Sequence, residues 1–93
     1  MTTIILYPTL EECIETAARN RYKQLTAAVL SDEEPPAGAV AELELLHAFL
    51  TSVDFRRLRA ESERALLQGS HVSFSIRGVG QKFTFEMTTR QEQ

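Results

Sequence analysis

Apolar and polar residues alternate most regularly between His71 and Met87, where the sequence reads HVSFSIRGVGQKFTFEM. The apolar residues fall at every second position on each side of the central glycines: Val72, Phe74, Ile76, Phe83, Phe85 and Met87. A period of two is typical of strands with one buried face, so the pattern predicts a β-hairpin that turns at Val79 and Gly80. Its expected register sets Ile76 opposite Phe83, Phe74 opposite Phe85 and Val72 opposite Met87.

A second run of β-branched and aromatic residues, Thr2–Tyr7, ends at a proline and predicts a short first strand. Ile4 and Leu6 would share one face of this strand, and Ile5 and Tyr7 would share the other. Because both faces are apolar, either the strand is covered on each side or its outer face meets another subunit. The alternative interpretation is an extended N-terminal arm.

The spacing of apolar residues then becomes helical and predicts a first helix from about Leu10 to Leu30. Thr9 is a suitable N-cap, and Glu12 three residues later completes a capping box. The apolar stripe of this helix would comprise Leu10, Ile14, Ala17, Ala18, Leu25, Ala28 and Val29. Arg21 projects into or beside that stripe. One interpretation is a snorkelling or ion-paired arginine at the edge of the core, and the other is a buried arginine that binds an anion.

The segment Ser31–Gly38, SDEEPPAG, combines acids with turn formers and a double proline, and it predicts a loop within the domain. A second helix is expected from about Pro36 to Thr51. One of its faces comprises Val40, Leu43, Leu46, His47 and Leu50, and Leu45 and Phe49 extend it. A helix this apolar is buried on two sides. It either lies between the first helix and the sheet or uses its second ridge as an oligomer interface.

A third helix is expected from about Asp54 to Gln68, ended by Gly69 in the position that favours glycine. Its buried stripe would comprise Phe55, Leu58, Ser62, Ala65 and Leu66. The polar tail, residues 88–93, is expected to fray.

The order of elements predicts one small α+β domain over residues 1–93, arranged β-α-α-α-β-β. The helices would pack on one face of the C-terminal antiparallel hairpin, with or without the N-terminal strand at its edge.

The cysteine content and the length of the N-terminal apolar run indicate the cellular compartment. The 93 residues include a single cysteine, Cys13, which has no partner for an internal disulfide and is typical of a reducing compartment. The apolar run Ile4–Tyr7 is far too short for a membrane span or a signal peptide, so we expect a cytoplasmic protein without a membrane partner.

The residues that could carry chemistry stand apart in the sequence. His47, His71 and Cys13 show no metal-ligand spacing, so no metal or cofactor is expected. We interpret Cys13 as a small buried hydrophobe, His47 as a core or interface histidine and His71 as exposed. No pattern indicates a catalytic site, and we expect a protein that is not an enzyme. A small-ligand or enzymatic role at a subunit interface would require Arg21, His47 and His71 to converge in a cleft, which the sequence leaves open.

Positive charge is concentrated in the C-terminal part. The chain carries 3 basic and 8 acidic residues up to Val53, and 7 basic and 5 acidic residues from Asp54 onward, for a total of −3. The candidate nucleic-acid contacts are Arg56, Arg57, Arg64, Arg77 and Lys82. Glu61 and Glu63 interleave with the arginines of the third helix and favour a solvated, ion-paired surface over a basic patch. In the segment RGVGQK, Gly78 and Gly80 are expected to supply the positive-φ positions of a hairpin turn.

Two hypotheses of function follow. The first is a non-enzymatic protein–protein interaction module that forms a homodimer, binds another protein or does both, with Ile5, Tyr7, Leu45 and Phe49 as the interface candidates. The second is a nucleic-acid-associated accessory protein that uses the basic face of the third helix and the tip of the hairpin.

Overall fold

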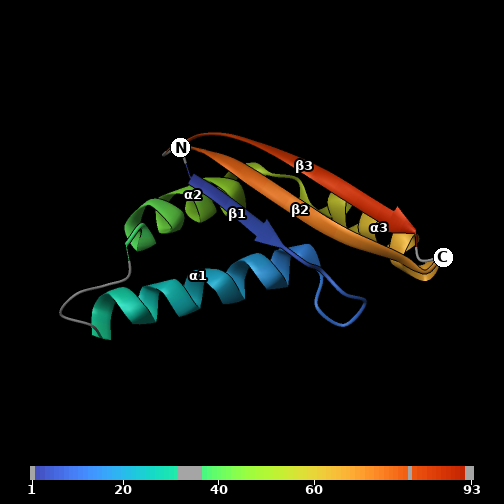
Figure 1. The fold of residues 1–93 in the computed structure, drawn as a ribbon, viewed down its shortest axis with the longest axis horizontal. Helices are drawn as coiled ribbons and strands as arrows, with labels where there is room; N and C mark the ends of the chain where they lie inside the picture. Colours follow the sequence, from blue (N-terminus) through green and yellow to red (C-terminus); the bar gives the residue numbers. More distant parts are fainter. Residues whose placement is uncertain (1, 32–36, 80, 92–93) are drawn as a thin grey trace.

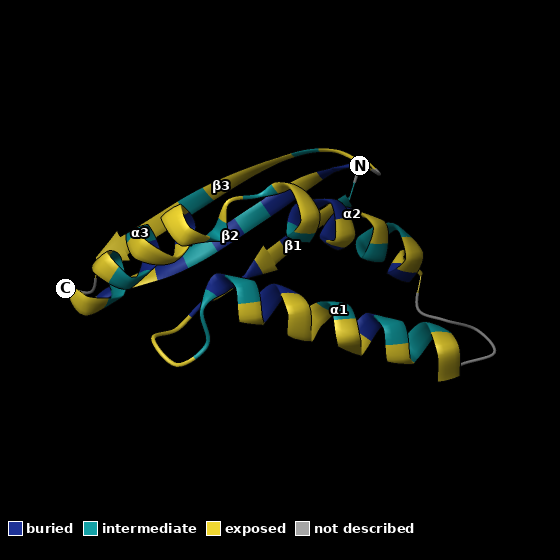
Figure 2. Ribbon diagram, turned by 180° about the vertical axis from the view of Figure 1, so that it is seen from behind, coloured by how far each residue is buried: buried dark blue, intermediate teal, exposed yellow. Residues whose placement is uncertain are grey.

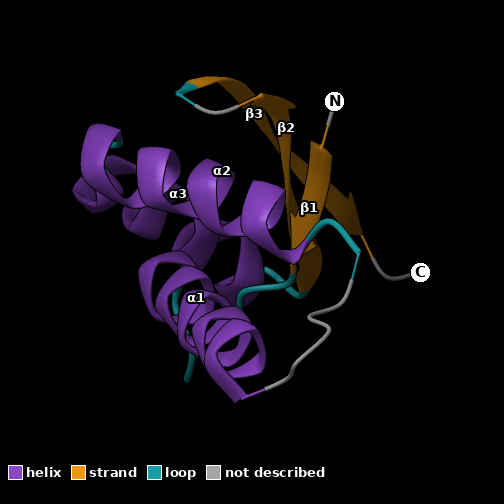
Figure 3. Cartoon of the chain, turned by 90° about the vertical axis from the view of Figure 1, so that its left-hand side faces the viewer, coloured by secondary structure: helices purple, strands orange, loops and turns teal. Residues whose placement is uncertain are grey.

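A computed structural model describes residues 2–31, 37–79 and 81–91 of the chain (Figure 1). Its elements, in chain order, are β1 (Thr2–Leu6), α1 (Ile14–Ser31), α2 (Ala39–Ser52), α3 (Phe55–Leu67), β2 (Ser70–Val79) and β3 (Lys82–Gln91). This order confirms the predicted α+β class. The helices all lie on one face of the sheet, as the side view in Figure 3 shows.

The sheet has the order β1-β2-β3, and both neighbouring pairs are antiparallel. The N-terminal strand therefore joins the sheet at the edge of β2, with Ile4 opposite Ile76 and Leu6 opposite Phe74. These four side chains are buried beneath the helices, whereas Ile5 points to the uncovered outer face. Alternation along β1 thus follows the predicted division into two faces.

The register of the hairpin differs from the predicted one by two residues. Val79 pairs with Lys82, so Ile76 lies opposite Phe85 and Phe74 opposite Met87. A shift of two residues leaves every side chain on its predicted face, which is why the hydrophobic pattern alone could not detect it. The turn centre that we expected includes Gly80, which lies outside the described residues.

Gly78 explains the observed register. It lies opposite Phe83, and a Cβ atom on it would come within 2.2 Å of the Lys82 carbonyl oxygen and 2.6 Å of Phe83 Cα. The positive φ that we expected at Gly78 is wrong, because among the described residues only Gly38 and Gly69 have one. Glycine is needed at position 78 for close approach of the two strands rather than for a turn.

The strand β3 also extends further than predicted. Residues 88–91 do not leave the sheet but continue the ladder, with Thr88 opposite Ser73 and Gln91 opposite Ser70. Two consecutive β-branched residues, Thr88 and Thr89, favour this extended conformation despite their polarity. Residues 92 and 93 lie outside the described part of the chain.

The first helix begins at Ile14, four residues after its predicted start. Thr9 does accept a hydrogen bond from the Glu12 backbone N–H at 2.9 Å, but the Thr9 N–H donates back to the Glu12 carbonyl at 2.8 Å. That second bond runs in the opposite sense to helical bonds, so the pair closes a loop instead of capping a helix. Leu10, which we expected in the buried stripe, is exposed at the tip of this loop.

The second helix lies between α1 and the sheet, which was the first of the two predicted arrangements. Leu45, Leu46 and Phe49 are fully buried in the resulting core. The helix follows Gly38, whose φ of 83° suits glycine, and the predicted start at Pro36 lies outside the described residues. His47 is exposed rather than part of the core.

The third helix confirms its prediction to within one residue at each end. Asp54 caps it by accepting a hydrogen bond from the Arg56 N–H at 3.1 Å, and Gly69 follows it with a φ of 84°. Leu58 and Ser62 are buried as expected. Helix α3 packs over β2, the central strand, and this lateral position leaves part of β3 uncovered.

Candidate protein-binding groove beside the free edge of the sheet

The strand β3 is the longer edge of the sheet formed by the described strands. It has ten residues, against five in β1, and only β2 pairs with it. Its apolar side chains face the helices but are incompletely covered: Phe83 and Met87 are half-buried, and Phe85 is 39% exposed. In Figure 2, β3 is largely coloured as exposed whereas β2 is largely buried or intermediate. An uncovered edge of this kind can accept another strand.

A groove of about 680 Å³ runs between this edge and the start of α3. Its apolar lining consists of Val53, Leu58, Phe83 and Phe85. Charged side chains at its rim come from the first two turns of α3 and the residue before it: Asp54, Arg57 and Glu61. Apolar walls with a charged rim are the usual composition of a protein-binding surface.

The aromatic part of the groove is anchored in the core. Phe49, on α2, contacts the rings of Phe55, Phe83 and Phe85 at centroid distances of 5.4, 6.0 and 5.5 Å, each in an edge-to-face arrangement. Such contacts add to the free energy of burial and fix the ring orientations. The groove is therefore a preformed surface, which lowers the entropic cost of binding.

The four interface candidates separate into two pairs. Ile5 and Tyr7 remain exposed, by 50% and 70%. Leu45 and Phe49 are fully buried inside the chain's own core, so the prediction that these two contact a partner is wrong. The reason is that α1 and the sheet cover both apolar sides of α2. Phe83 and Phe85 were assigned to the core by their alternation, and no signal in the sequence marked them as groove residues.

The five candidate nucleic-acid contacts do not form one surface. Arg57 lies at the groove rim, where its Nε is 3.2 Å from Glu61 Oε1, and Arg59 pairs with Glu63 at 3.4 Å. Arg56 lies on the other side of the α3 start, and Arg64 is in the last turn of that helix. Only Arg77 and Lys82 come together, beside the hairpin turn.

The outer face of the sheet carries a further cation that the sequence did not single out. Arg90, in the segment expected to fray, alternates with Lys82 and Glu86 along β3 and points away from the helices. Arg90 was not among the predicted contacts because we expected residues 88–93 to leave the sheet.

Arg21, His47 and His71 do not converge. Arg21 lies 3.6 Å from Glu42 across the α1–α2 contact, which supports the ion-paired interpretation over the buried anion site. His47 is also on that side of the molecule, with its ring 6.5 Å from that of Tyr22. His71 is in β2, on the outer face of the sheet.

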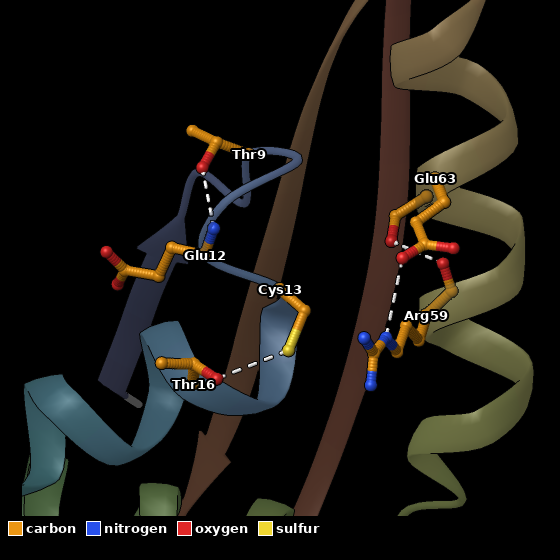
Figure 4. A network of polar contacts seen from close by, with 7 residues as sticks. Thr9, Glu12, Cys13, Thr16, Arg59 and Glu63 are labelled. Carbon is orange, nitrogen blue, oxygen red and sulfur yellow. Dashed lines mark hydrogen bonds and ion pairs between the residues drawn. The ribbon is translucent and has the colours of Figure 1, made fainter.

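Cys13 is half-buried rather than buried, immediately before α1 (Figure 4). Its Sγ lies 3.3 Å from Thr16 Oγ1. Hydrogen bonds from the Thr16 hydroxyl and backbone N–H lower the pKa of the thiol; Arg59 and the Glu15 N–H act in the same direction, and burial partly opposes them. The first free N–H groups of a helix are expected to favour a thiolate in this way.

No group of three or more His, Cys, Asp or Glu side chains in residues 2–31, 37–79 and 81–91 could hold a metal ion. Within the same ranges, none of the helices has the length and apolar character that crossing a membrane would require.

The architecture defines a small α+β domain whose helices cover one face of an antiparallel sheet. A protein-family model matches residues 3–86, from β1 into β3, and the chain belongs to that family. An uncharacterized protein of Archaeoglobus fulgidus is 37% identical over 76 residues, which cover 80% of this chain and 86% of the relative. No solved structure matches the chain significantly.

Proposed function

We propose that this protein is a non-enzymatic protein–protein interaction module that acts as a homodimer in the cytoplasm. The observation that carries the proposal is the apolar groove beside β3, an edge strand whose aromatic side chains are only partly covered. Proteins usually shield such an edge with charge, a bulge or a partner. A domain of 93 residues buries a limited fraction of its surface, so burial of further apolar surface against a partner increases its stability.

The distribution of reactive groups supports a role without catalysis. Cys13 precedes α1, His47 lies on α2 and His71 lies on the outer face of β2. The Cys13 thiol contacts the Thr16 hydroxyl and the His47 ring lies near that of Tyr22, and neither neighbour is the base or orienting acid that nucleophilic catalysis uses. The single, half-buried thiol fits a reducing compartment.

Solution mass tests the proposal. We expect the wild-type chain to elute as a dimer in size-exclusion chromatography with light scattering, at tens of micromolar and moderate salt. Replacing Phe85 by alanine removes the exposed ring from the groove and should shift the population to the monomer. Leu67→Ala is the matched control, because Leu67 is an exposed apolar residue at the far end of α3. A wild-type chain that stays monomeric up to about 100 μM would contradict homodimerisation.

A second candidate function rests on the pair Arg77 and Lys82. These two side chains line one shallow depression of about 370 Å³ beside the hairpin turn, and Arg90 lies on the same outer face of the sheet. Backbone phosphates of a nucleic acid would bind there mainly through charge. The test is binding of single- and double-stranded DNA and RNA from about 50 to 200 mM salt, where affinity should fall steeply. Lys82→Gln should weaken binding and reduce the salt slope by about one.

A further inference from the structure

The charged residues on the outer face of β3 are spaced so that two antiparallel copies of the strand can place opposite charges against each other. The side chains pointing away from the helices are, in order, Lys82, Thr84, Glu86, Thr88 and Arg90. Their charges read positive, neutral, negative, neutral, positive. A strand with this pattern can pair with a second copy of itself in some registers and is repelled in others.

In an antiparallel pair about a twofold axis, the position of the axis determines which charged residues of the two copies lie opposite each other. An axis at Glu86 would set Glu86 opposite its own copy and Lys82 opposite Arg90, so all charged pairs would repel each other. An axis at Thr84 sets Lys82 opposite Glu86 of the partner subunit, twice. An axis at Thr88 sets Glu86 opposite Arg90 of the partner subunit, also twice. Opposite charges across a strand pair favour the last two registers.

The apolar face decides between them. With the axis at Thr84, Phe83 faces Phe85 of the partner subunit, twice, and both half-covered rings gain an aromatic neighbour. With the axis at Thr88, Phe85 would face Gln91 and Phe83 would face no residue of the strand. An axis at Phe85 would match the apolar face but set Lys82 and Glu86 opposite threonines, without an ion pair. The Thr84 register is the one that matches both faces.

We propose that the groove partner is a second copy of this chain, and that the two β3 strands pair over Lys82–Glu86 about a twofold axis at Thr84. This inference rests on the proposed function and specifies its interface. An axis perpendicular to the sheet keeps the helices of both copies on one face and joins the two grooves across the axis. Helix α3 leaves room for this arrangement, because it packs over β2 rather than β3. Phenylalanine burial supplies most of the affinity, and the ion pairs select the register.

Charge reversal tests the register. Lys82→Glu and Glu86→Lys each create two like-charge pairs and should weaken the dimer about tenfold at low salt. An equimolar mixture of the two variants restores both pairs in a heterodimer, and the double variant K82E/E86K restores them in a homodimer. Both samples should return to within about threefold of the wild-type dissociation constant. Arg90→Glu is the matched control, because Arg90 lies outside the paired segment and its reversal should leave the dimer unchanged.

A disulfide provides a direct distance measurement. Residues opposite each other at a twofold axis between antiparallel strands have Cα atoms about 4.5–5.5 Å apart, within the range that a disulfide spans. In a Cys13→Ser background, Thr84→Cys should form a covalent dimer under mild oxidation, whereas Thr88→Cys should not. Thermal unfolding of each variant under reducing conditions verifies that it is folded.

The outcomes separate this inference from the function on which it rests. A monomeric wild-type chain overturns both. A second outcome is a dimer that Phe85→Ala dissociates but that Lys82→Glu does not weaken, with no cross-link at either position. This result would support the groove interface and overturn the strand pairing. A dimer that responds to Arg90→Glu and cross-links through Thr88→Cys overturns the Thr84 register in favour of the Thr88 register.

Discussion

Phe49 and Phe85 meet edge to face, with ring centroids 5.5 Å apart and planes inclined by 74°. Phe49 is fully buried on α2, whereas Phe85 is 39% exposed on the free strand β3. The contact joins the core of the domain directly to the candidate binding groove. Stability and binding can therefore be separated experimentally by substituting one ring or the other.

Replacing Phe49 by alanine should destabilise the domain severely. The change removes a fully buried ring together with its contacts to three other aromatic rings, and we expect a loss of about 3–5 kcal/mol in the free energy of unfolding. Urea unfolding followed by far-UV circular dichroism measures it. Leu67→Ala, at an exposed site, should change the same quantity by less than about 0.5 kcal/mol. Equal losses for the two variants would contradict the assigned core.

The sequence predicted the architecture because each element has its own periodicity. The pattern from Val72 to Met87 established the two strands and their faces, and Asp54 with Gly69 marked the limits of α3. The register of the hairpin could not follow from the pattern, because a shift of two residues preserves all faces. The deciding feature, the close approach of Phe83 to Gly78, is a contact between strands.

The groove could not be predicted for a related reason. Two apolar ridges on the second helix correctly indicated burial on two sides, but a single sequence does not say whether a partner or the chain itself covers them. The same uncertainty applied to Phe85, which alternates like a core residue. Its partial exposure arises because α3 is centred over β2, and that lateral position depends on packing rather than on local pattern.

Gly78→Ala should destabilise the hairpin more than a glycine substitution in open space. The new Cβ would overlap backbone atoms of Lys82 and Phe83, so the strands must separate, at an expected cost of about 2–3 kcal/mol in unfolding free energy. Gly69→Ala is the comparison: no atom would lie within 4 Å of its Cβ, and only the positive φ of 84° is strained, by about 1 kcal/mol. Thermal or urea unfolding of both variants measures the difference, and a smaller loss at position 78 would argue against the observed register.

Arg21 and Glu42 should be coupled weakly. Their charged atoms are 3.6 Å apart, but the side chains are 45% and 24% exposed, so solvent screens the attraction. A double-mutant cycle with Arg21→Gln and Glu42→Gln should give a coupling energy below about 1 kcal/mol. The coupling should also decrease between low and high salt. A strong, salt-independent coupling would instead indicate a buried site of the kind that the sequence left open at Arg21.

Cys13 should react with alkylating reagents at a lower pH than an ordinary thiol. The Thr16 hydroxyl and backbone N–H lower its pKa by stabilising the thiolate, which is the reactive form. Replacing Thr16 by valine removes the hydroxyl at nearly constant size, so the pKa should rise and the rate of reaction with iodoacetamide near pH 7 should fall. Thr16→Ser keeps the hydroxyl and should retain the wild-type pH profile. Identical profiles for the valine and serine variants would assign the shift to the backbone N–H groups and Arg59 rather than to the hydroxyl.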